Sequence, residues 1–225
     1  MSSTSPNVPP VVAWRHPRPI GAEGRCIGRT NLPVDRRKAK RLAHRIRRAA
    51  RLHGWPRVVR TSSLQRCAAV GRQLRHWGWR HHIDDSLIEM DFGAWEGLRW
   101  EQIAHAEVEV WCQDFAHHAP GGGESLHAML QRVSGSLTRL SCWAEGPASA
   151  PLADLRSAEP RVSSASTPVL IVAHAGWILS ARWVAGHTAA PAHAGEWPSA
   201  PRYGECCTWP EAPLQYRPVD PASRK

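Results

Sequence analysis

Two short stretches of the chain are hydrophobic without interruption, residues 11–14 (VVAW) and residues 169–173 (VLIVA). A continuous apolar run of this length is typical of a strand that is buried on both faces, as in a parallel sheet. Residues 57–61 and 81–84 are predicted as two further strands. The proline-rich end of the chain allows one edge strand, around residues 206–209.

Between these strands the apolar residues recur at spacings of three and four, which predicts amphipathic helices. Asp35 opens a helix that runs to about His53, where Gly54 and Pro56 end it. Its predicted buried stripe is Ala39, Leu42, Ala43, Ile46, Ala49 and Ala50. A second stripe, beginning after Glu124, is Leu126, Leu130, Val133, Leu137 and Leu140.

Three more helices are predicted from the same spacing. Ser62 or Ser63 is expected to cap a helix over residues 64–77, because a serine oxygen can accept from a free amide of the first turn. Residues 98–115 and 176–185 have helical patterns as well. Strands that alternate with helices predict a three-layer α/β/α sandwich with a mainly parallel sheet.

The domain organisation follows from length and from local composition. We expect residues 1–10 to be a disordered leader and residues 11–217 to form a single domain. Residues 144–168, rich in Ala, Pro and Ser, are predicted as a surface insertion of that domain, and residues 218–225 as a tail. The chain has 225 residues, enough for one good-sized core.

Composition narrows the class of protein. No apolar run approaches the ~20 residues of a membrane span, and the first residues lack the pattern of a signal peptide, so a cytoplasmic protein is expected. The six cysteines have no Cys-x-x-Cys spacing, which disfavours structural zinc and favours small buried hydrophobic side chains.

Charge is distributed unevenly along the chain. Residues 1–82 carry 19 Lys and Arg but only two acidic residues, Glu23 and Asp35. Such an excess fits either a nucleic-acid-binding protein or a site for anionic small molecules beside a solvated basic helix. The arginines of residues 36–51 fall on the polar face of one helix, and no nucleic-acid motif is recognisable. We therefore expect a phosphorylated small-molecule partner and no nucleic acid, and leave the oligomeric state open.

Candidate chemistry lies at the ends of the predicted strands. Arg15 and His16 directly follow the first strand, and His174 follows the strand over residues 169–173. Arg66 falls in the first turn of the helix after the second strand. Because open α/β sheets bind ligands at the carboxyl ends of their strands, these groups predict an anion site, where planar guanidinium donors match phosphate oxygens.

A phosphoryl group bound there needs a nucleophile and a source of protons. An uncharged His16 can attack phosphorus, and the neighbouring arginines favour its neutral form by repelling a second positive charge. The leaving alcohol needs a proton, which a carboxylic acid usually supplies. Glu89, in the loop after the predicted 81–84 strand, is the candidate donor.

The order of these segments resembles the histidine phosphatase superfamily, the phosphoglycerate-mutase-like enzymes. The matching segments are WRHPRP, GRTNLPV, TSSLQRC, LIEMDFGAWEG, GGGESLHAMLQRV and VLIVAHAGW, over about residues 11–186. The resemblance implies a phosphohistidine on His16, phosphoryl binding by Arg15, Arg66 and His174, and a proton from Glu89. It also implies that no metal or other cofactor takes part.

Within that superfamily the chain is most similar to the α-ribazole phosphatases of cobalamin assembly. This similarity assigns Arg29 and Thr30 to the phosphate side of the pocket, adds Ala175 to the substrate-binding residues, and gives Glu124 and Ser125 a structural role. Pro17 departs from the usual glycine and holds His16 in an extended conformation. A broad phosphomonoesterase remains an alternative, as does a mutase-like enzyme, although the Trp-Asn element of the mutases is missing.

Overall fold

The computed structural model describes residues 10–144 and 167–209, and its centre is a five-stranded sheet of order β3-β2-β4-β1-β5. The strands are β1 (Val11–Arg15), β2 (Val58–Thr61), β3 (Arg80–Ile83), β4 (Val169–Ala173) and β5 (Cys206–Trp209). The first four are parallel to one another, and β5 runs antiparallel to β1 at the sheet edge. The predicted strands and the mainly parallel sheet are confirmed.

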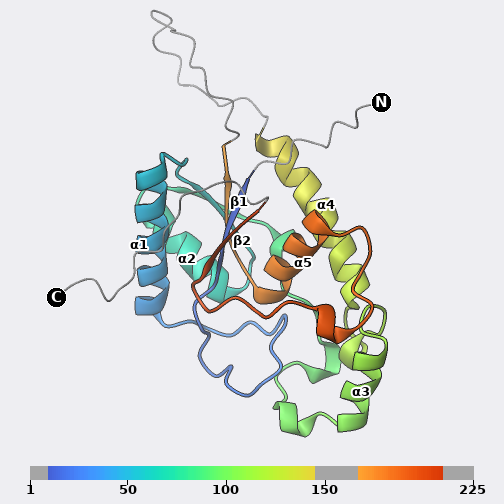
Figure 1. Ribbon diagram of the computed structural model, residues 1–225. Coiled ribbons are helices and arrows are strands. Elements are labelled where there is room, and N and C mark those ends of the chain that lie inside the picture. The colour runs from blue at the N-terminus through green and yellow to red at the C-terminus, as the bar shows by residue number, and fades with distance from the viewer. Residues whose placement is uncertain (1–9, 145–166, 210–225) are drawn as a thin grey trace, which may run out of the picture.

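Helices cover both faces of this sheet, as the three-layer prediction requires. Figure 1 shows α1 and α2 on one side of the strands and α4 and α5 on the other. The helices are α1 (Arg36–His53), α2 (Gln65–His76), α3 (His105–Gln113), α4 (Leu126–Ala144) and α5 (Ala175–Gly186). No helix among the described residues has the length and hydrophobicity needed to cross a membrane.

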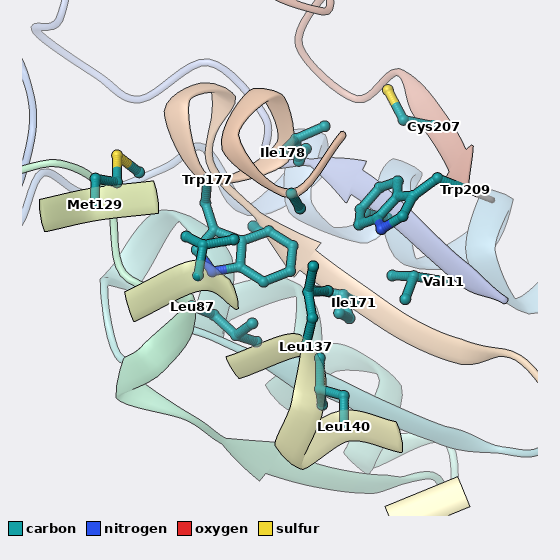
Figure 2. Packing of buried hydrophobic residues seen from close by; sticks show 14 of the residues in the cluster. Val11, Leu87, Met129, Leu137, Leu140, Ile171, Trp177, Ile178, Cys207 and Trp209 are labelled. Atoms are coloured by element: carbon teal, nitrogen blue, oxygen red, sulfur yellow. The ribbon is translucent and has the colours of Figure 1, made fainter. Parts of the chain in front are cut away.

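The central strands divide their side chains between two hydrophobic cores. In β1, Val11 and Ala13 join the core under α4 and α5, whereas Val12 and Trp14 join the core under α1 and α2. This split follows from the period of two along a strand. Figure 2 shows the first core, in which Trp177 of α5 lies among Ile171 of β4 and Leu137 of α4.

Local signals determine the ends of α1 as expected. The Asp35 carboxylate accepts a hydrogen bond of 2.9 Å from the Lys38 amide, and Gly54 ends the helix in the left-handed conformation with φ of 66°. All six residues of the predicted stripe are buried. The charged residues of the helix consequently face solvent.

The helix predicted over residues 98–115 is too long. Only α3 is α-helical there, and Trp100–Gln102 forms a short 3-10 turn. The reason is a tertiary pairing, since Cys26 donates to the Leu98 carbonyl at 2.9 Å and Trp100 donates to the Gly24 carbonyl at 3.0 Å. These hydrogen bonds to the 17–33 loop replace the bonds of a regular helix.

Two smaller predictions are corrected by the structure. Neither Ser62 nor Ser63 caps α2, whose N-cap is Leu64 in an extended conformation without a side-chain hydrogen bond. Cys112 is exposed on α3 instead of buried, because no residue of that short helix is buried. Residues 1–9 of the predicted leader, the predicted tail and almost all of the predicted 144–168 insertion lie outside the described residues.

Candidate active site

The two strand-end histidines lie next to each other because β1 and β4 are parallel neighbours in register. Arg15 is paired with Ala173, so the following residues, His16 and His174, leave the sheet at the same edge. The His16 amide also donates to the Ala173 carbonyl at 3.0 Å. The two imidazole centroids are 5.0 Å apart, and the residues are 4% and 0% exposed.

Arg66, in the first turn of α2, joins the two histidines. Its Nε lies 3.3 Å from His16 Nε2 and 3.2 Å from His174 Nδ1. Its terminal nitrogens donate to backbone carbonyls of the 17–33 loop, those of Thr30 at 2.7 Å and of Gly28. The guanidinium is 1% exposed, and its Nε–H is directed at the space between the two rings. The structure therefore brings these three predicted residues together.

The hydrogen bonds assign a tautomer to each histidine. A guanidinium only donates, so His16 Nε2 and His174 Nδ1 must both present lone pairs to Arg66. The proton of His16 is then on Nδ1, which donates to the Pro17 carbonyl at 2.8 Å. The proton of His174 is on Nε2, 2.7 Å from the Ser62 hydroxyl. His16 Nε2 is thus unprotonated and carries a lone pair, as the predicted nucleophile requires.

Burial and charge keep both rings neutral. Burial, together with the charges of Arg66 and Arg15, holds the pKa of His16 well below its ordinary value of 6.5. The pKa of His174 is lowered for the same reasons, burial first and the charge of Arg66 second. Both imidazoles are consequently unprotonated on one nitrogen at neutral pH.

Glu89 reaches the same cavity from the loop after β3. Its carboxylate accepts from the Gly176 amide at 3.1 Å and from the Met90 amide at 3.0 Å, and the residue is 8% exposed. Gly176 lies in the first turn of α5, where a side-chain carbon would overlap a carboxylate oxygen of Glu89. The start of α5 therefore positions both His174 and Glu89.

Arg15 approaches the cavity from its rim. Its Nη1 donates to the Pro201 carbonyl at 2.7 Å, and its guanidinium carbon lies 3.9 Å from the centre of the Tyr203 ring. Its Nε is buried and has no hydrogen-bond partner among the described residues. The residue nevertheless lines the cavity, so its guanidinium adds positive charge there. Ala175, another predicted substrate-binding residue, lines the same cavity.

The side chains of Arg29 and Thr30 do not join the two histidines and Arg66. Arg29 pairs with Asp91 at 3.2 Å and with Glu124 at 3.4 Å, and the Thr30 hydroxyl donates to Glu96. Thr30 acts on the site through its carbonyl, which binds Arg66. The side chains of Arg29 and Thr30 thus attach the 17–33 loop to neighbouring carboxylates.

Glu96, which the sequence did not single out, anchors that loop. Its carboxylate accepts from the amides of Gly28, Arg29 and Thr30 at 3.2, 2.7 and 2.9 Å. Burial alone would raise the pKa of Glu96, but the hydrogen bonds from Thr30, Arg29 and Phe92 together hold it below its ordinary value. An ionised Glu96 thus fixes the carbonyls that hold Arg66.

A second clamp holds the loop that carries Glu89. Arg132 of α4 donates to the Ile88 carbonyl at 2.9 Å and to the Glu89 carbonyl at 3.1 Å. Glu124 binds the same guanidinium through both oxygens, at 2.6 and 3.0 Å. This bidentate pair orients Arg132 toward the loop. The predicted structural role of Glu124 agrees with this arrangement.

The cavity in front of these groups has a volume of about 530 Å³ and is largely aromatic and aliphatic. The charged and titratable groups Arg15, His16, Arg66 and Glu89 all line it. Its hydrophobic wall is Ile27, Met90, Phe92, Trp100, Trp111, Phe115, Leu126, Met129, Leu179 and Trp197. Such a site can bind an anionic group at its charged end and an apolar group along its wall.

Three residues of the site escaped the sequence prediction, namely Ser62, Glu96 and Tyr203. Ser62 follows β2 directly, so the strand-end argument that selected His16 would also have selected it. Glu96 and Tyr203 carry no comparable signal, because loops from distant parts of the chain bring them to the site. Among the described residues, no group of three or more His, Cys, Asp or Glu side chains could hold a metal ion.

Known proteins resemble this chain at both the sequence and the structural level. Residues 11–194 match the histidine phosphatase superfamily (branch 1). A stretch of 67 residues is 42% identical to a bifunctional protein of Mycobacterium tuberculosis; it makes up 28% of this chain but only 18% of that protein. Another, of 62 residues, is 37% identical to the adenosylcobalamin/α-ribazole phosphatase of Escherichia coli and covers 26% of this chain and 30% of that enzyme.

The fold has solved counterparts. The α-ribazole phosphatase of Shigella flexneri superposes with a TM-score of 0.63, at 23% sequence identity, over 88% of this chain and 89% of that one. The three-layer arrangement of sheet and helices is therefore shared across nearly the whole of both chains.

Proposed function

The chain belongs to the histidine phosphatase superfamily, and from this membership we propose that it hydrolyses phosphomonoesters through a phosphohistidine on His16. One observation carries the proposal. The unprotonated Nε2 of a buried, neutral His16 is 3.3 Å from the Nε of Arg66, so a nucleophile and an oxyanion donor are neighbours in one site. A phosphoryl group bound in that site would contact both.

In the first step the lone pair of His16 Nε2 attacks phosphorus and the bond to the ester oxygen breaks. The Nδ1–H bond to the Pro17 carbonyl orients the ring and stabilises the positive charge that develops on it. Arg66 and Arg15 donate to the phosphoryl oxygens. His174, whose N–H is bound to Ser62, holds Arg66 through its Nδ1 instead of donating to the phosphoryl group. Glu89, in its acid form, gives its proton to the departing alkoxide.

In the second step water attacks the phosphohistidine. The Glu89 carboxylate left by the first step accepts a proton from this water, the N–P bond breaks, and inorganic phosphate leaves. His16 regains its neutral form. The chain's own groups thus supply the nucleophile, the proton transfers and the charge stabilisation of both steps.

For the substrate we propose α-ribazole 5′-phosphate or its cobalamin-linked form. The aromatic wall, with Phe92, Trp100, Trp111 and Trp197, suits a substrate with an aromatic base, which can stack on such rings. The stretch shared with the Escherichia coli phosphatase gives this assignment its second support. A broad-specificity phosphomonoesterase is the alternative, since an apolar wall accepts many hydrophobic alcohols.

Phosphate release tests the reaction. The wild-type protein, with a chelator present, should release phosphate from an aryl phosphate, and His16→Ala should lose at least about a thousandfold in kcat, as expected for a lost nucleophile. His105→Ala, on the exposed surface of α3, is the matched control. Equal rates for wild type and His16→Ala would contradict the proposal.

Relative catalytic efficiency tests the substrate. The value of kcat/KM should be highest for α-ribazole 5′-phosphate, lower for the aryl phosphate and lowest for 3-phosphoglycerate, which has no apolar group. Similar efficiencies on the first two would favour the broad-specificity alternative. A preference for 3-phosphoglycerate would contradict both.

A further inference from the structure

A second groove, lined by cations, adjoins the catalytic cavity. Its volume is about 530 Å³, and it is lined by Pro17, Arg18, Lys38, Arg41, Leu42, Arg45, Tyr203 and Gly204. Four of these residues are cationic, and no carboxylate is among the described residues that line the groove. Four like charges around one hollow repel one another unless an anion lies between them.

The Tyr203 ring is shared by this groove and the catalytic cavity. Tyr203 lines both spaces and is 37% exposed. The ring centre lies 3.9 Å from the guanidinium carbon of Arg15, 5.5 Å from that of Arg18, and 5.7 Å from the centre of the His16 ring. A molecule bound at His16 could therefore extend past the tyrosine into the groove.

The helix α1 supplies three of the four cations. Lys38, Arg41 and Arg45 follow one another at spacings of three and four, which places them on one face of the helix. Lys38 and Arg41 lie in the first two turns of the helix, and Arg45 lies near its middle. A side-chain carbon at Gly204 would come within 3.2 Å of Arg45 Nη1, so this guanidinium lies over the loop before β5.

These cations have few acidic partners among the described residues. Within residues 10–144 and 167–209, none of Lys38, Arg41 and Arg45 forms an ion pair. Arg18 approaches Glu23 at 3.7 Å, but their side chains are 56% and 88% exposed, so the pair is weak. The described part of the chain thus leaves the groove with an excess of positive charge.

We propose that this groove is a second anion-binding subsite, and that among phosphomonoesters with the same organic group the enzyme prefers the one that carries a second phosphate. The inference rests on the proposed function, because it assumes that the first phosphate is cleaved at His16. The second phosphate passes Tyr203 and binds to Arg41 and Arg45, which form ion pairs with its oxygens. The apolar wall of the catalytic cavity binds the part of the molecule between the ester oxygen and the groove.

A series of linear alkanediol bisphosphates of increasing length, each paired with its monophosphate, tests the subsite. We expect the ratio of kcat/KM for the bisphosphate to that for the monophosphate to exceed one only when the linker is long enough to pass Tyr203. In the double variant Arg41→Gln/Arg45→Gln this ratio should fall about tenfold, the effect of two partly solvated ion pairs.

The matched control is Arg47→Gln/Arg48→Gln. It removes the same charge from the same helix, at exposed positions outside the groove, and should leave the ratio unchanged. A ratio that never exceeds one in wild type would overturn the subsite, and so would an equal fall in both double variants, which would indicate general electrostatic attraction. Either result leaves phosphate release by wild type intact.

Binding to the inactive His16→Ala protein separates the two proposals. Calorimetry should show tighter binding of the long bisphosphate than of its monophosphate, and the difference should disappear when Arg41→Gln/Arg45→Gln is added. This result together with no turnover of any ester by wild type would refute the phosphatase mechanism and retain the anion site. Equal binding of the two ligands would refute the anion site.

Discussion

One guanidinium determines the state of two histidines at this site. Because Arg66 can only donate, it makes lone-pair acceptors of His16 and His174, and it lowers the pKa of each. The remaining ring protons go to fixed acceptors, the Pro17 carbonyl and the Ser62 hydroxyl. The tautomer, charge and orientation of the two histidine rings thus follow from a few hydrogen bonds between buried groups.

The variant Ser62→Ala tests the hydrogen bond between the Ser62 hydroxyl and the His174 ring. Ser62→Ala leaves the buried Nε2–H of His174 with only the weaker acceptor Cys67 Sγ, 3.4 Å away, so we expect a loss of about 1 kcal/mol in the free energy of unfolding together with a lower kcat. Ser63→Ala, at the adjacent exposed position, should change neither. Urea unfolding and steady-state kinetics on one aryl phosphate give the two values. An unchanged stability in Ser62→Ala would contradict the assigned hydrogen bond.

The variant Arg15→Gln tests how the charge of Arg15 affects the pKa of His16. Removing this cation takes away one of the causes that lower the pKa of His16, so the pKa rises. The acidic limb of kcat/KM against pH, where His16 becomes protonated, should therefore move to higher pH in Arg15→Gln than in wild type. Both proteins are measured with the same substrate, so the titration of the substrate's phosphate group affects the two profiles equally. A limb that stays in place or moves to lower pH would count against His16 as the titrating nucleophile.

Loops at this site take their shape from residues far away in sequence. Glu96 holds the loop of Gly28 and Thr30, and Arg132 of α4 holds the loop of Glu89. Each clamp uses a charged side chain that binds several backbone groups at once. The loops are therefore rigid parts of the site even though they contain little regular structure.

Arg132→Lys tests the second clamp. A lysine keeps the charge but cannot donate to both the Ile88 and Glu89 carbonyls while it pairs with Glu124. If Arg132 positions the proton donor, kcat should fall about tenfold for alkyl phosphates, whose leaving groups need a proton, and little for aryl phosphates with acidic phenols. Arg139→Lys, exposed on the same helix, is the control. Equal losses on both substrate types would indicate a purely structural effect.

The same distinction between local and distant causes explains how far the sequence could predict the molecule. The limits of α1 depend on Asp35 and Gly54, which act within one turn, and its buried face followed from spacing alone. The segment 98–115 was predicted with too much helix because its hydrogen bonds go to residues 24–26. The direction of the Arg29 side chain could not be predicted either, since its carboxylate partners come from two other loops.

Histidines buried in neutral form make the stability of the whole molecule depend on pH. The pKa values of His16 and His174 are lowered by burial, and burial together with nearby arginines lowers the pKa of His81 to about 4. In the unfolded chain these groups titrate near 6.5. As pH falls below 6.5 the unfolded state therefore binds more protons than the folded state, and stability decreases.

Urea midpoints at pH 7.5 and pH 5 test this linkage. The midpoint should be lower at pH 5, and the difference should shrink in His81→Gln, which removes one of the histidines whose pKa is lowered in the folded protein. His105→Gln, on the exposed face of α3, should leave the difference unchanged. A midpoint that rises toward pH 5 would contradict the sign of all three shifts.

The position of β4 between β2 and β1 has a consequence for the newly made chain. Until residue 173 has left the ribosome, no strand joins β1 to the β2–β3 pair. The other neighbour of β1, β5, is translated later still. The imidazole of His16 is translated 158 residues before that of His174. A nascent chain that ends before β4 therefore has neither the second imidazole nor the central strand, and the proposed site is completed only when that strand is inserted.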